Sequence, residues 1–438
     1  MKFPAYPKYK TSGVEWLGDV PEHWEVKRLS YLATLKSGEN ITSEMIAEDG
    51  AYPVYGGNGL RGNYHKFTHR GHYALIGRQG ALCGNINYAS GEFWASEHAL
   101  VVSPLQEFAV VWMGELLRAM NLGQYSVTAA QPGIAAEMVR GLRIPLPPLS
   151  EQQAIAAYLD RETGRLDRLV GRKRELIERL KEKRTALISR TVTRGLPPAA
   201  ARAAGLPAHP PLKPSGLDWL GDIPKHWEVK RLKFIFPRLL SGVSVNSDNS
   251  PSLDDSPAIL KTSSVYGNKF QPGENKRVLE TELDRVACPV TGDSLIISRM
   301  NTPELVGNCG YVERDHLNLF LPDRLWIARF SKYPKTTGKF AWYLAISHAL
   351  CALTGSLATG TSDSMKNLTQ EAFLNIPVGV PLLPEQTAIA DYLDAETAKL
   401  DALVGKVEEA VERLQEYRTA LITAAVTGKI DVRKAVKP

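Results

Sequence analysis

Glycine, asparagine, arginine and glutamine are concentrated in two short runs in the first half of the chain. The first run is Tyr52-Pro-Val-Tyr-Gly-Gly-Asn-Gly-Leu-Arg-Gly62, and the second is Ile76-Gly-Arg-Gln-Gly80 followed by Gly84-Asn85. Glycine lets a backbone approach another molecule closely, while Asn, Gln and Arg match the hydrogen-bonding edges of adenine and guanine. A comparable stretch in the second half is Ile297-Ser-Arg-Met-Asn301, then Gly307-Asn308. Each run alone could be an ordinary turn, but together they favour loops that read nucleic acid.

Acidic residues are absent from one long window in each half. Residues 50–91 contain no Asp or Glu, and neither do residues 324–362, although both windows contain several Lys and Arg. A surface that meets phosphates must lack carboxylates, so these windows favour a polyanion partner over chance clustering. The net charge of +6 is too mild to show this by itself. The predicted DNA contacts are Asn58, Arg61, Lys66, Arg70, Arg78 and Gln79 in the first half, and Lys261, Lys269, Arg299, Asn301, Ser362 and Lys366 in the second.

Sequence motifs of catalysis are missing. There is no Gly-x-x-x-x-Gly-Lys-Ser/Thr loop for ATP, and no Asn/Asp-Pro-Pro-Tyr/Phe box of the kind that holds a flipped base in amino-methyltransferases. His65, His69 and His72 could suggest zinc, but no cysteine lies at ligand spacing beside them. We therefore predict a chain that is not an enzyme and binds no metal.

A nuclease is the one catalytic alternative with suitable residue types. Asp254 or Asp255, combined with Glu274-Asn275-Lys276, could hold a divalent ion beside a basic group. However, Pro272-Gly273 directly precedes the glutamate and argues against the strand that such a site needs. We prefer the non-catalytic interpretation.

Two blocks of the sequence occur twice. Ser12–Leu29, a block with two tryptophans that we call the Trp box, returns as Ser215–Leu232 with 14 of 18 positions identical. Glu151–Thr193 returns as Glu385–Thr427 with 27 of 43 identical. The inserts between the blocks, 30–146 and 233–380, look largely unlike each other. Two repeated frames holding two different inserts predict two different readers in one fixed geometry.

The second repeated block predicts a long helix in each half. Its apolar residues alternate in steps of three and four, the pattern of a coiled coil, and 43 residues of helix span about 65 Å. The economical partner for such a stripe is the other copy, folded back antiparallel. The residues predicted to pair the helices are Leu159, Leu166, Leu169, Leu176, Leu180, Leu187, Leu393, Leu400, Leu403, Leu414 and Leu421. Gly171 and Gly405 lie at matched positions, and either close packing or a kink would explain them.

These patterns give an α+β fold with an internal pseudo-twofold repeat. We expect six segments: a first reading domain with its Trp box (1–146), a first long helix (147–194), a Pro/Ala linker (195–214), a second reading domain with its Trp box (215–380), a second long helix (381–430) and a tail (431–438). The four cysteines show no Cys-x-x-Cys spacing and are expected to be reduced thiols in the cytoplasm. No apolar run approaches the roughly 20 residues of a membrane helix, so no membrane association is expected.

The motifs in this order resemble the specificity subunit of type I restriction–modification systems. The resemblance is carried by the Trp box, the Tyr-Pro-Val-Tyr-Gly-Gly-Asn-Gly run, Pro145-Leu-Pro-Pro-Leu-Ser-Glu-Gln152 and the closing Ala425-Val-Thr-Gly-Lys-Ile-Asp-Val-Arg433. It implies two target-recognition domains joined by two antiparallel helices, in a subunit that reads a split, asymmetric DNA site and performs no chemistry. The second insert lacks the Tyr-Pro-Val-Tyr-Gly-Gly run.

The same resemblance implies partners. These are double-stranded DNA, two adenine-N6 methyltransferase subunits and two ATP-driven restriction subunits, with S-adenosylmethionine, ATP and Mg²⁺ bound by those subunits and no cofactor by this chain. Within the inserts, Arg61 and Arg78 are expected to contact guanine and Lys66 to contact phosphate. The long helices are expected to set the distance between the half-sites. The alternatives are a free-standing enzyme and a specificity or DNA-binding scaffold module of another DNA-modifying complex.

Overall fold

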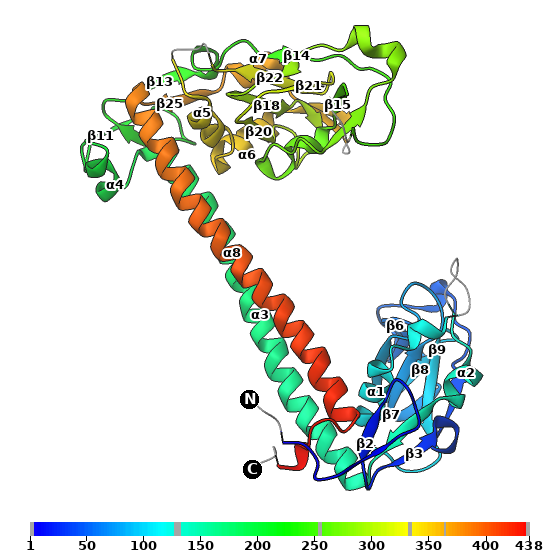
Figure 1. The fold of residues 1–438 in the computed structure, drawn as a ribbon. Helices are drawn as coiled ribbons and strands as arrows, with labels where there is room; N and C mark the ends of the chain where they lie inside the picture. Colours follow the sequence, from blue (N-terminus) through cyan, green and yellow to red (C-terminus); the bar gives the residue numbers. More distant parts are fainter. Residues whose placement is uncertain (1–3, 127–132, 253–255, 332–334, 363–364, 435–438) are drawn as a thin grey trace. The chain divides into compact units, whose positions relative to one another are not determined.

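A computed structural model describes residues 4–126, 133–252, 256–331, 335–362 and 365–434 (Figure 1). By internal packing the chain divides into two compact units. Unit 1 contains residues 1–175 and 407–438, and unit 2 contains residues 176–406. Unit 1 therefore combines the two ends of the sequence, and its core includes Val432 near the C-terminus.

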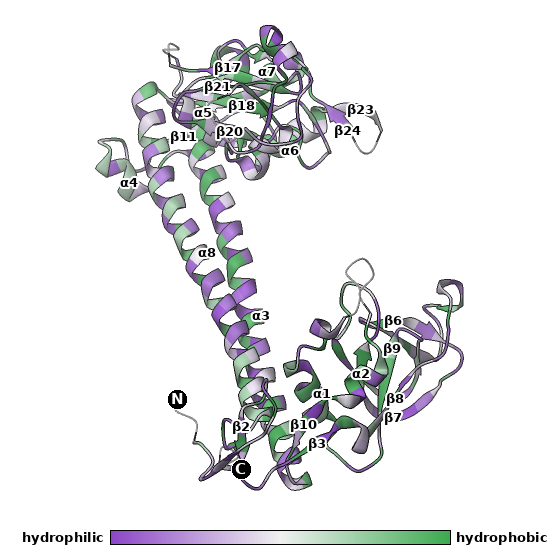
Figure 2. Cartoon of the chain, turned by 45° about the vertical axis from the view of Figure 1, so that its right-hand side comes forward, coloured by the Kyte–Doolittle hydropathy of each residue, from purple (hydrophilic) through white to green (hydrophobic). Residues whose placement is uncertain are grey.

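Two long helices dominate the secondary structure. Helix α3 covers Leu149–Arg194 and helix α8 covers Leu383–Val426. Each begins directly after a proline-rich segment, as expected for a residue type that suits a helix start but not a helix interior. The predicted pair of long helices is confirmed. The bounds of α3 lie within two residues of the expected 147–194, whereas α8 ends four residues before the expected end at residue 430. Figure 2 shows hydrophilic and hydrophobic bands alternating along both helices.

Two ion pairs show that the helices are antiparallel and related by the repeat. In unit 1, Arg418 donates to Asp167 through Nε and Nη2, at 2.9 and 3.3 Å. In unit 2, Arg184 Nε lies 3.0 Å from Asp401 Oδ1. Moving along α3 from Asp167 to Arg184 moves the partner back along α8 by the same number of residues. Asp401 and Arg418 are also the repeat copies of Asp167 and Arg184, so one contact is made twice, as pseudo-twofold symmetry requires.

Three of the predicted pairing residues lie outside the buried seam of the long helices. Leu169, Leu176 and Leu403 are 40, 42 and 44% exposed, so they lie outside the seam. In α3 the adjacent residues Val170 and Ile177 are buried instead, each 8% exposed. In α8 the buried residues include Val407, which has the heptad spacing of Leu400 and Leu414, and Val411, at 7 and 9% exposed. The remaining predicted pairing residues are buried or half-buried: Leu159, Leu166, Leu180, Leu187, Leu393, Leu400, Leu414 and Leu421.

The glycines inside the long helices are not points of close packing. A Cβ atom added to Gly171 or Gly405 would meet nothing within 4 Å. Both helices are continuous through these positions. Of the two explanations left open by the sequence, close approach of the helix backbones is therefore wrong.

The insert of unit 1 is a six-stranded sheet with helices beside it. The strands follow the order β4-β9-β7-β8-β5-β6. All neighbours are antiparallel except β5 and β8. Helix α1 (Val110–Ala119) packs on β7 and β8, and α2 (Ala136–Gly141) packs near β4. The strands are β4 (Ala33–Ser37), β5 (Tyr52–Gly56), β6 (Gly59–Tyr64), β7 (His69–Gly77), β8 (Ile86–Ala95) and β9 (Ala99–Pro104).

The insert of unit 2 contains two four-stranded sheets and one three-stranded sheet, in the orders β14-β22-β18-β20, β16-β15-β21-β17 and β19-β24-β23. Its helices are α5 (Gly338–Ala345), α6 (His348–Leu357) and α7 (Gln370–Leu374). The strands are β14 (Leu240–Ser241), β15 (Ala258–Leu260), β16 (Asn275–Arg277), β17 (Pro289–Val290), β18 (Ser294–Ser298), β19 (Met300–Asn301), β20 (Cys309–Val312), β21 (His316–Phe320), β22 (Leu325–Arg329), β23 (Thr359–Ser362) and β24 (Met365–Asn367). Both units mix helices with sheets, which confirms the α+β class.

The repeated Trp boxes close each unit in the same way. In unit 1, β3 (Glu25–Arg28) pairs with β10 (Arg143–Leu146), and in unit 2, β13 (Glu228–Arg231) pairs with β25 (Pro377–Val380). Each pairing fastens the start of an insert to its end. A smaller pair stands beside each: β1 (Tyr9–Thr11) with β2 (Asp19–Pro21), and β11 (Leu212–Pro214) with β12 (Asp222–Pro224). The linker also contains α4 (Pro198–Ala203).

Side chains of the repeated blocks connect each Trp box to the start of a long helix within the same unit. Trp24 and Trp227 are fully buried, each in the core of its own unit. His23 Nε2 lies 2.8 Å from Glu151 Oε2, and its copy His226 lies 2.7 Å from Glu385 Oε2. The Trp box thus has a structural role in each unit.

Among the described residues, no single helix is both long and apolar enough to cross a membrane. The bent pair α5 and α6 passes that test only when its two helices are taken together. Most of the apolar residues of α5 are buried in the core of unit 2.

Candidate nucleic-acid interface

The loop after β7 in unit 1 is fixed by backbone hydrogen bonds. Arg78 N donates to His98 O at 2.8 Å, and Ile134 N donates to Arg78 O at 2.9 Å. The preceding Gly77 exchanges bonds with the far side of the loop, since Gly84 N donates to Gly77 O at 2.7 Å. Gly77 N in turn donates to Asn85 O at 2.8 Å. We call residues 78–85 the first Arg loop.

The loop after β18 in unit 2 has the same pattern. Arg299 N donates to Arg324 O at 3.0 Å, and Leu368 N donates to Arg299 O at 2.8 Å. Ser298 takes the place of Gly77. Ser298 N donates to Asn308 O at 2.8 Å, and Gly307 N donates to Ser298 O at 2.8 Å. Residues 299–308 therefore form a second Arg loop with the same frame, although the two inserts look unlike in sequence.

The side chains of the first Arg loop form a polar cluster at one end of the sheet. Arg78 Nη1 donates to Ser37 Oγ at 2.8 Å, at the end of β4. Gln79 Oε1 lies 3.0 Å from His98 Nδ1, and Asn58 Oδ1 accepts from Asn85 Nδ2 at 3.3 Å. Three predicted DNA contacts, Arg78, Gln79 and Asn58, thus come from two separate segments to one place.

Gly57 of the first glycine-rich run and Gly77 of the second have a different role from the one predicted. A Cβ on Gly77 would lie 2.3 Å from Gly57 O, and a Cβ on Gly57 would lie 3.0 Å from His98 O. The bare backbones therefore pack against each other inside the protein. The expectation that these glycines serve close approach to another molecule is wrong for Gly57 and Gly77, because the space beside them is already filled.

The second Arg loop presents fewer free groups. Asn301 is only 8% exposed, and its Nδ2 donates to Ser298 Oγ at 3.3 Å and to the Tyr266 hydroxyl at 3.4 Å. Asn301 is paired with Lys366 across β19 and β24, and β23, which ends at Ser362, pairs with β24. Asn301, Lys366 and Ser362 therefore belong to neighbouring strands of one small sheet. The Asn301 amide, however, is committed to neighbours within the fold.

The other predicted contacts of unit 1 are exposed and lie outside the cluster. Arg61 is on β6, Lys66 follows it in the connection to β7, and Arg70 is on β7. Arg70 Nε lies 3.7 Å from Glu92 Oε1 on the neighbouring strand. An exposed pair of this kind contributes little free energy, so Arg70 remains available to a phosphate.

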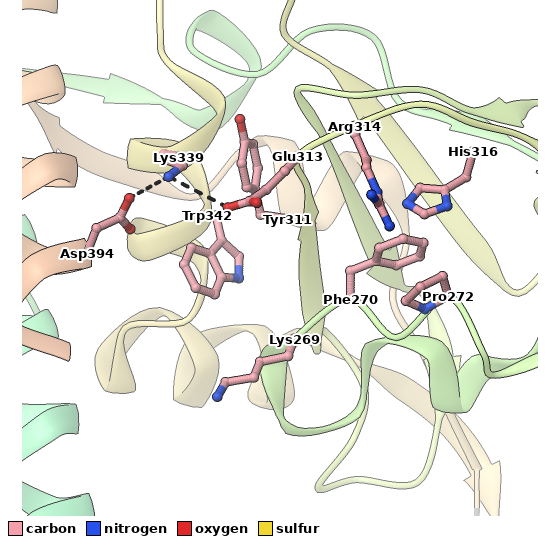
Figure 3. A pocket seen from close by; sticks show the side chains of 10 residues that line it. All are labelled: Lys269, Phe270, Pro272, Tyr311, Glu313, Arg314, His316, Lys339, Trp342 and Asp394. Carbon is pink, nitrogen blue, oxygen red and sulfur yellow. Dashed lines mark hydrogen bonds and ion pairs between the residues drawn. The ribbon is translucent and has the colours of Figure 1, made fainter. Parts of the chain in front are cut away.

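Lys261 and Lys269 of unit 2 face carboxylates. Lys261 Nζ lies 3.8 Å from Glu274, and Lys269 Nζ lies 3.4 Å from Asp401 on α8. Lys269 also lines a pocket of about 470 Å³ (Figure 3). In that pocket Lys339 lies between Asp394 and Glu313. These carboxylates reduce the positive potential there, so the pocket is a weaker candidate for phosphate than the Arg loops.

The three histidines considered for zinc do not converge. His69 and His72 are three residues apart on β7 and so project from opposite faces of the strand. The His69 ring stacks on Phe93 at a centroid distance of 5.5 Å, and burial there lowers the pKa of His69. In the described parts of the chain, no three His, Cys, Asp or Glu side chains gather as metal ligands. Asp254 and Asp255 of the nuclease alternative lie outside the described residues.

Sequence reasoning missed the residues that hold the Arg loops. Ser37 and His98 support Arg78 and Gln79, while Arg324 supports Arg299 only through its backbone carbonyl. Ser37 and His98 lie at the ends of strands far from the loop in sequence. A signal for them would have required knowledge of the strand order, which alternation of apolar residues does not contain.

Comparison with known proteins matches this architecture. The family model "Type I restriction modification DNA specificity domain" matches residues 21–179 and 224–413. The specificity subunit of the type I restriction enzyme EcoprrI of Escherichia coli is 41% identical over 139 residues, which are 31% of this chain and 35% of that protein. The chain thus spans about a third of that relative. The MjaVIII specificity subunit of Methanocaldococcus jannaschii is 23% identical over 438 residues, 94% of each chain.

Solved structures show the same fold. One, described as the structural basis of complex assembly and conformational transition of the type I R-M system, has a TM-score of 0.65 at 17% identity and covers 93% of this chain and 98% of its own. The HsdS subunit from Thermoanaerobacter tengcongensis has a TM-score of 0.52 at 15% identity, with coverage of 96 and 100%. The family model and the named relatives are type I specificity proteins and the solved structures share the fold, so this chain belongs to the type I restriction–modification DNA specificity family.

Proposed function

We propose that the chain reads a split, asymmetric DNA site and directs partner adenine-N6 methyltransferase and ATP-dependent restriction subunits to it. The observation that carries this proposal is the pair of Arg loops. Two dissimilar inserts, held in repeated frames, present an arginine on the same hydrogen-bonded loop. Arginine is the side chain that most often reads guanine in the major groove.

The division between reading and positioning follows from the two kinds of basic residue. Hydrogen bonds hold both the backbone and the side chain of Arg78, so its side chain loses little conformational entropy when it contacts a base edge. Lys66 and Arg61 are exposed and suit phosphate contacts, which set affinity without sequence information. This assignment moves Arg61 from the guanine contact expected from sequence to a phosphate contact.

The partners are proposed from the family and from chemistry that this sequence lacks. Assembly is the subject of one of the matched structures. The sequence has neither an ATP loop nor an amino-methyltransferase box, so methyl transfer and translocation would belong to other chains, with S-adenosylmethionine, ATP and Mg²⁺ bound there. The chain would act in the cytoplasm, where the host DNA is.

Methylation assays of the purified chain test the proposal directly. The chain alone should transfer no methyl group to DNA, and addition of the methyltransferase encoded beside it should give adenine methylation at one split sequence. Replacing residues 30–146 with the corresponding insert of a relative should change one half of that sequence and leave the other half unchanged. Methylation by the isolated chain, or a change in both halves, contradicts the proposal.

A further inference from the structure

The carboxylate at the start of α3 uses both oxygens inside unit 1. Glu151 Oε2 binds His23 at 2.8 Å, and Oε1 accepts a hydrogen bond from the Tyr6 hydroxyl. Tyr6 is only 4% exposed and packs edge-on against Trp24, and the Arg433 guanidinium lies 4.9 Å from the centre of its ring. Burial and the neighbouring carboxylate raise the pKa of Tyr6, so its hydroxyl remains a donor.

The matching carboxylate of unit 2 uses only one oxygen. Glu385 Oε2 binds His226 at 2.7 Å. Within the part of the chain that the structure describes, no donor reaches Glu385 Oε1. Strands β1 and β11 pair with their neighbours in the same register, so the position that corresponds to Tyr6 is His209. His209 is exposed and does not fill the place of a tyrosine.

A pocket of about 480 Å³ opens beside Glu385. Its walls are mostly apolar and come from the linker and from the start of α8; the lining includes Leu206, Pro207, Pro210, Pro211, Leu382 and Pro384. Leu382 is 69% exposed and adds apolar surface to the wall of this pocket. Polar groups enter the lining from Lys225, His226 and Glu385. An apolar cavity with one carboxylate oxygen free has the chemistry that a tyrosine side chain requires.

We propose that this pocket binds a tyrosine of a partner polypeptide, with the phenol hydroxyl donating to Glu385 Oε1. The internal Tyr6 of unit 1 shows which ligand the repeated frame accepts. In unit 2 the frame is retained and the tyrosine is missing, so the site is available to a partner in trans.

Fluorine NMR with 4-fluorophenol tests the site on the full-length chain. The wild-type protein should broaden the 4-fluorophenol signal with a dissociation constant in the millimolar range, as expected for a ligand of eight non-hydrogen atoms. The matched compound 4-fluorotoluene lacks the hydroxyl and should bind about tenfold more weakly, because a hydrogen bond to a charged group is lost. Equal binding of the two compounds would mean that the pocket takes an apolar side chain, and would overturn the proposal.

Two variants separate this pocket from other phenol sites. His209→Tyr restores the residue found at position 6 and should remove 4-fluorophenol binding, because the new side chain fills the pocket from within. Glu385→Gln should weaken 4-fluorophenol binding about tenfold and leave 4-fluorotoluene unchanged. Binding that is unaffected by both variants contradicts the proposal. A wild-type dimer that His209→Tyr converts to a monomer would identify the occupant as a second copy of the chain, and would also overturn it.

The identity of the partner needs one more measurement, which alone rests on the proposed function. In the complex with the methyltransferase, 4-fluorophenol binding should be lost because the partner's tyrosine occupies the pocket. If the complex forms and still binds 4-fluorophenol as the free chain does, the methyltransferase is not the occupant. Failure of the complex to methylate DNA would instead count against the proposed function, so the two results are distinguishable.

Discussion

Arg78 differs from the other basic residues of unit 1 because the fold holds it on two sides. Its backbone bonds to His98 and Ile134, and its guanidinium donates to Ser37 Oγ at 2.8 Å. Arg78→Ala should therefore relax specificity at one position of one half-site, with a loss of about 1–3 kcal/mol of discrimination there. Mapping of methylated adenines in cells that carry the variant measures this. Equal weakening on all sequences would identify Arg78 as a phosphate contact.

Lys66→Ala is the matched comparison for a positioning contact. Lys66 is exposed in the connection between β6 and β7. Its removal should weaken DNA binding by a similar factor on every sequence. The slope of log K against log [salt] should become shallower by about one, because one phosphate contact is lost. Binding titrations of the assembled complex at several salt concentrations give both quantities. A change in the preferred sequence would show that Lys66 reads a base.

At the residue scale, the sequence matches two stretches that share one backbone frame, but it does not reveal the residues that support them. The stretches around Arg78 and Arg299 were matched from residue types alone, and their backbone bonds agree. Ser37 and the buried state of the Asn301 amide depend on strand order and on packing in three dimensions. Residue types determine which chemistry is possible, but the neighbours that orient or occupy a side chain come from distant parts of the chain.

At the element scale, the glycines of the long helices offer a prediction of increased stability. A Cβ at Gly171 or Gly405 meets nothing within 4 Å, and glycine in a helix interior costs about 0.5–1 kcal/mol relative to alanine. Gly171→Ala and Gly405→Ala should each raise the free energy of unfolding by about that amount in urea titrations. Gly114→Ala in α1 is the control: its Cβ would lie 2.3 Å from the Tyr88 hydroxyl, so it should destabilise.

Adjacent residues in α3 test the phase of the helix seam. Ile177 is 8% exposed and Leu176 is 42% exposed. Ile177→Ala should lower the free energy of unfolding by about 2 kcal/mol or more, because it leaves a cavity in the seam. Leu176→Ala should change it by about 0.5 kcal/mol. Thermal or urea unfolding measures both variants, and the reverse order of effects would restore the phase predicted from the leucines.

The seam also shows why a helix is easier to predict than its buried face. Alternating steps of three and four predict both long helices to within four residues of their ends. Adjacent apolar residues such as Leu176 and Ile177 fit steps of three and four almost equally well, so spacing alone does not choose between them. Packing against the partner helix determines which of these residues is buried. The same packing brings Asp167 to Arg418 and Arg184 to Asp401.

At the scale of the whole molecule, both long helices run from one unit into the other, since each unit contains part of α3 and part of α8. The length of the pair is therefore predicted to set the spacer between the two half-sites. Four residues, about one turn, inserted after Glu178 should lengthen α3 by about 6 Å and rotate its apolar face by only about 40°. Because the helices are antiparallel, a matching insertion directly before Val407 preserves their pairing.

At about 3.4 Å per base pair, this change corresponds to nearly two base pairs, so the preferred spacer should grow while both half-sites stay the same. Genome-wide mapping of methylated adenines reads half-sites and spacer in one experiment. The competing hypothesis is that the helices serve only as a docking surface for the methyltransferases. Under it, the insertion weakens assembly and leaves the spacer of the remaining activity unchanged. An unchanged spacer with intact assembly would therefore rule out the helix pair as the element that sets the distance.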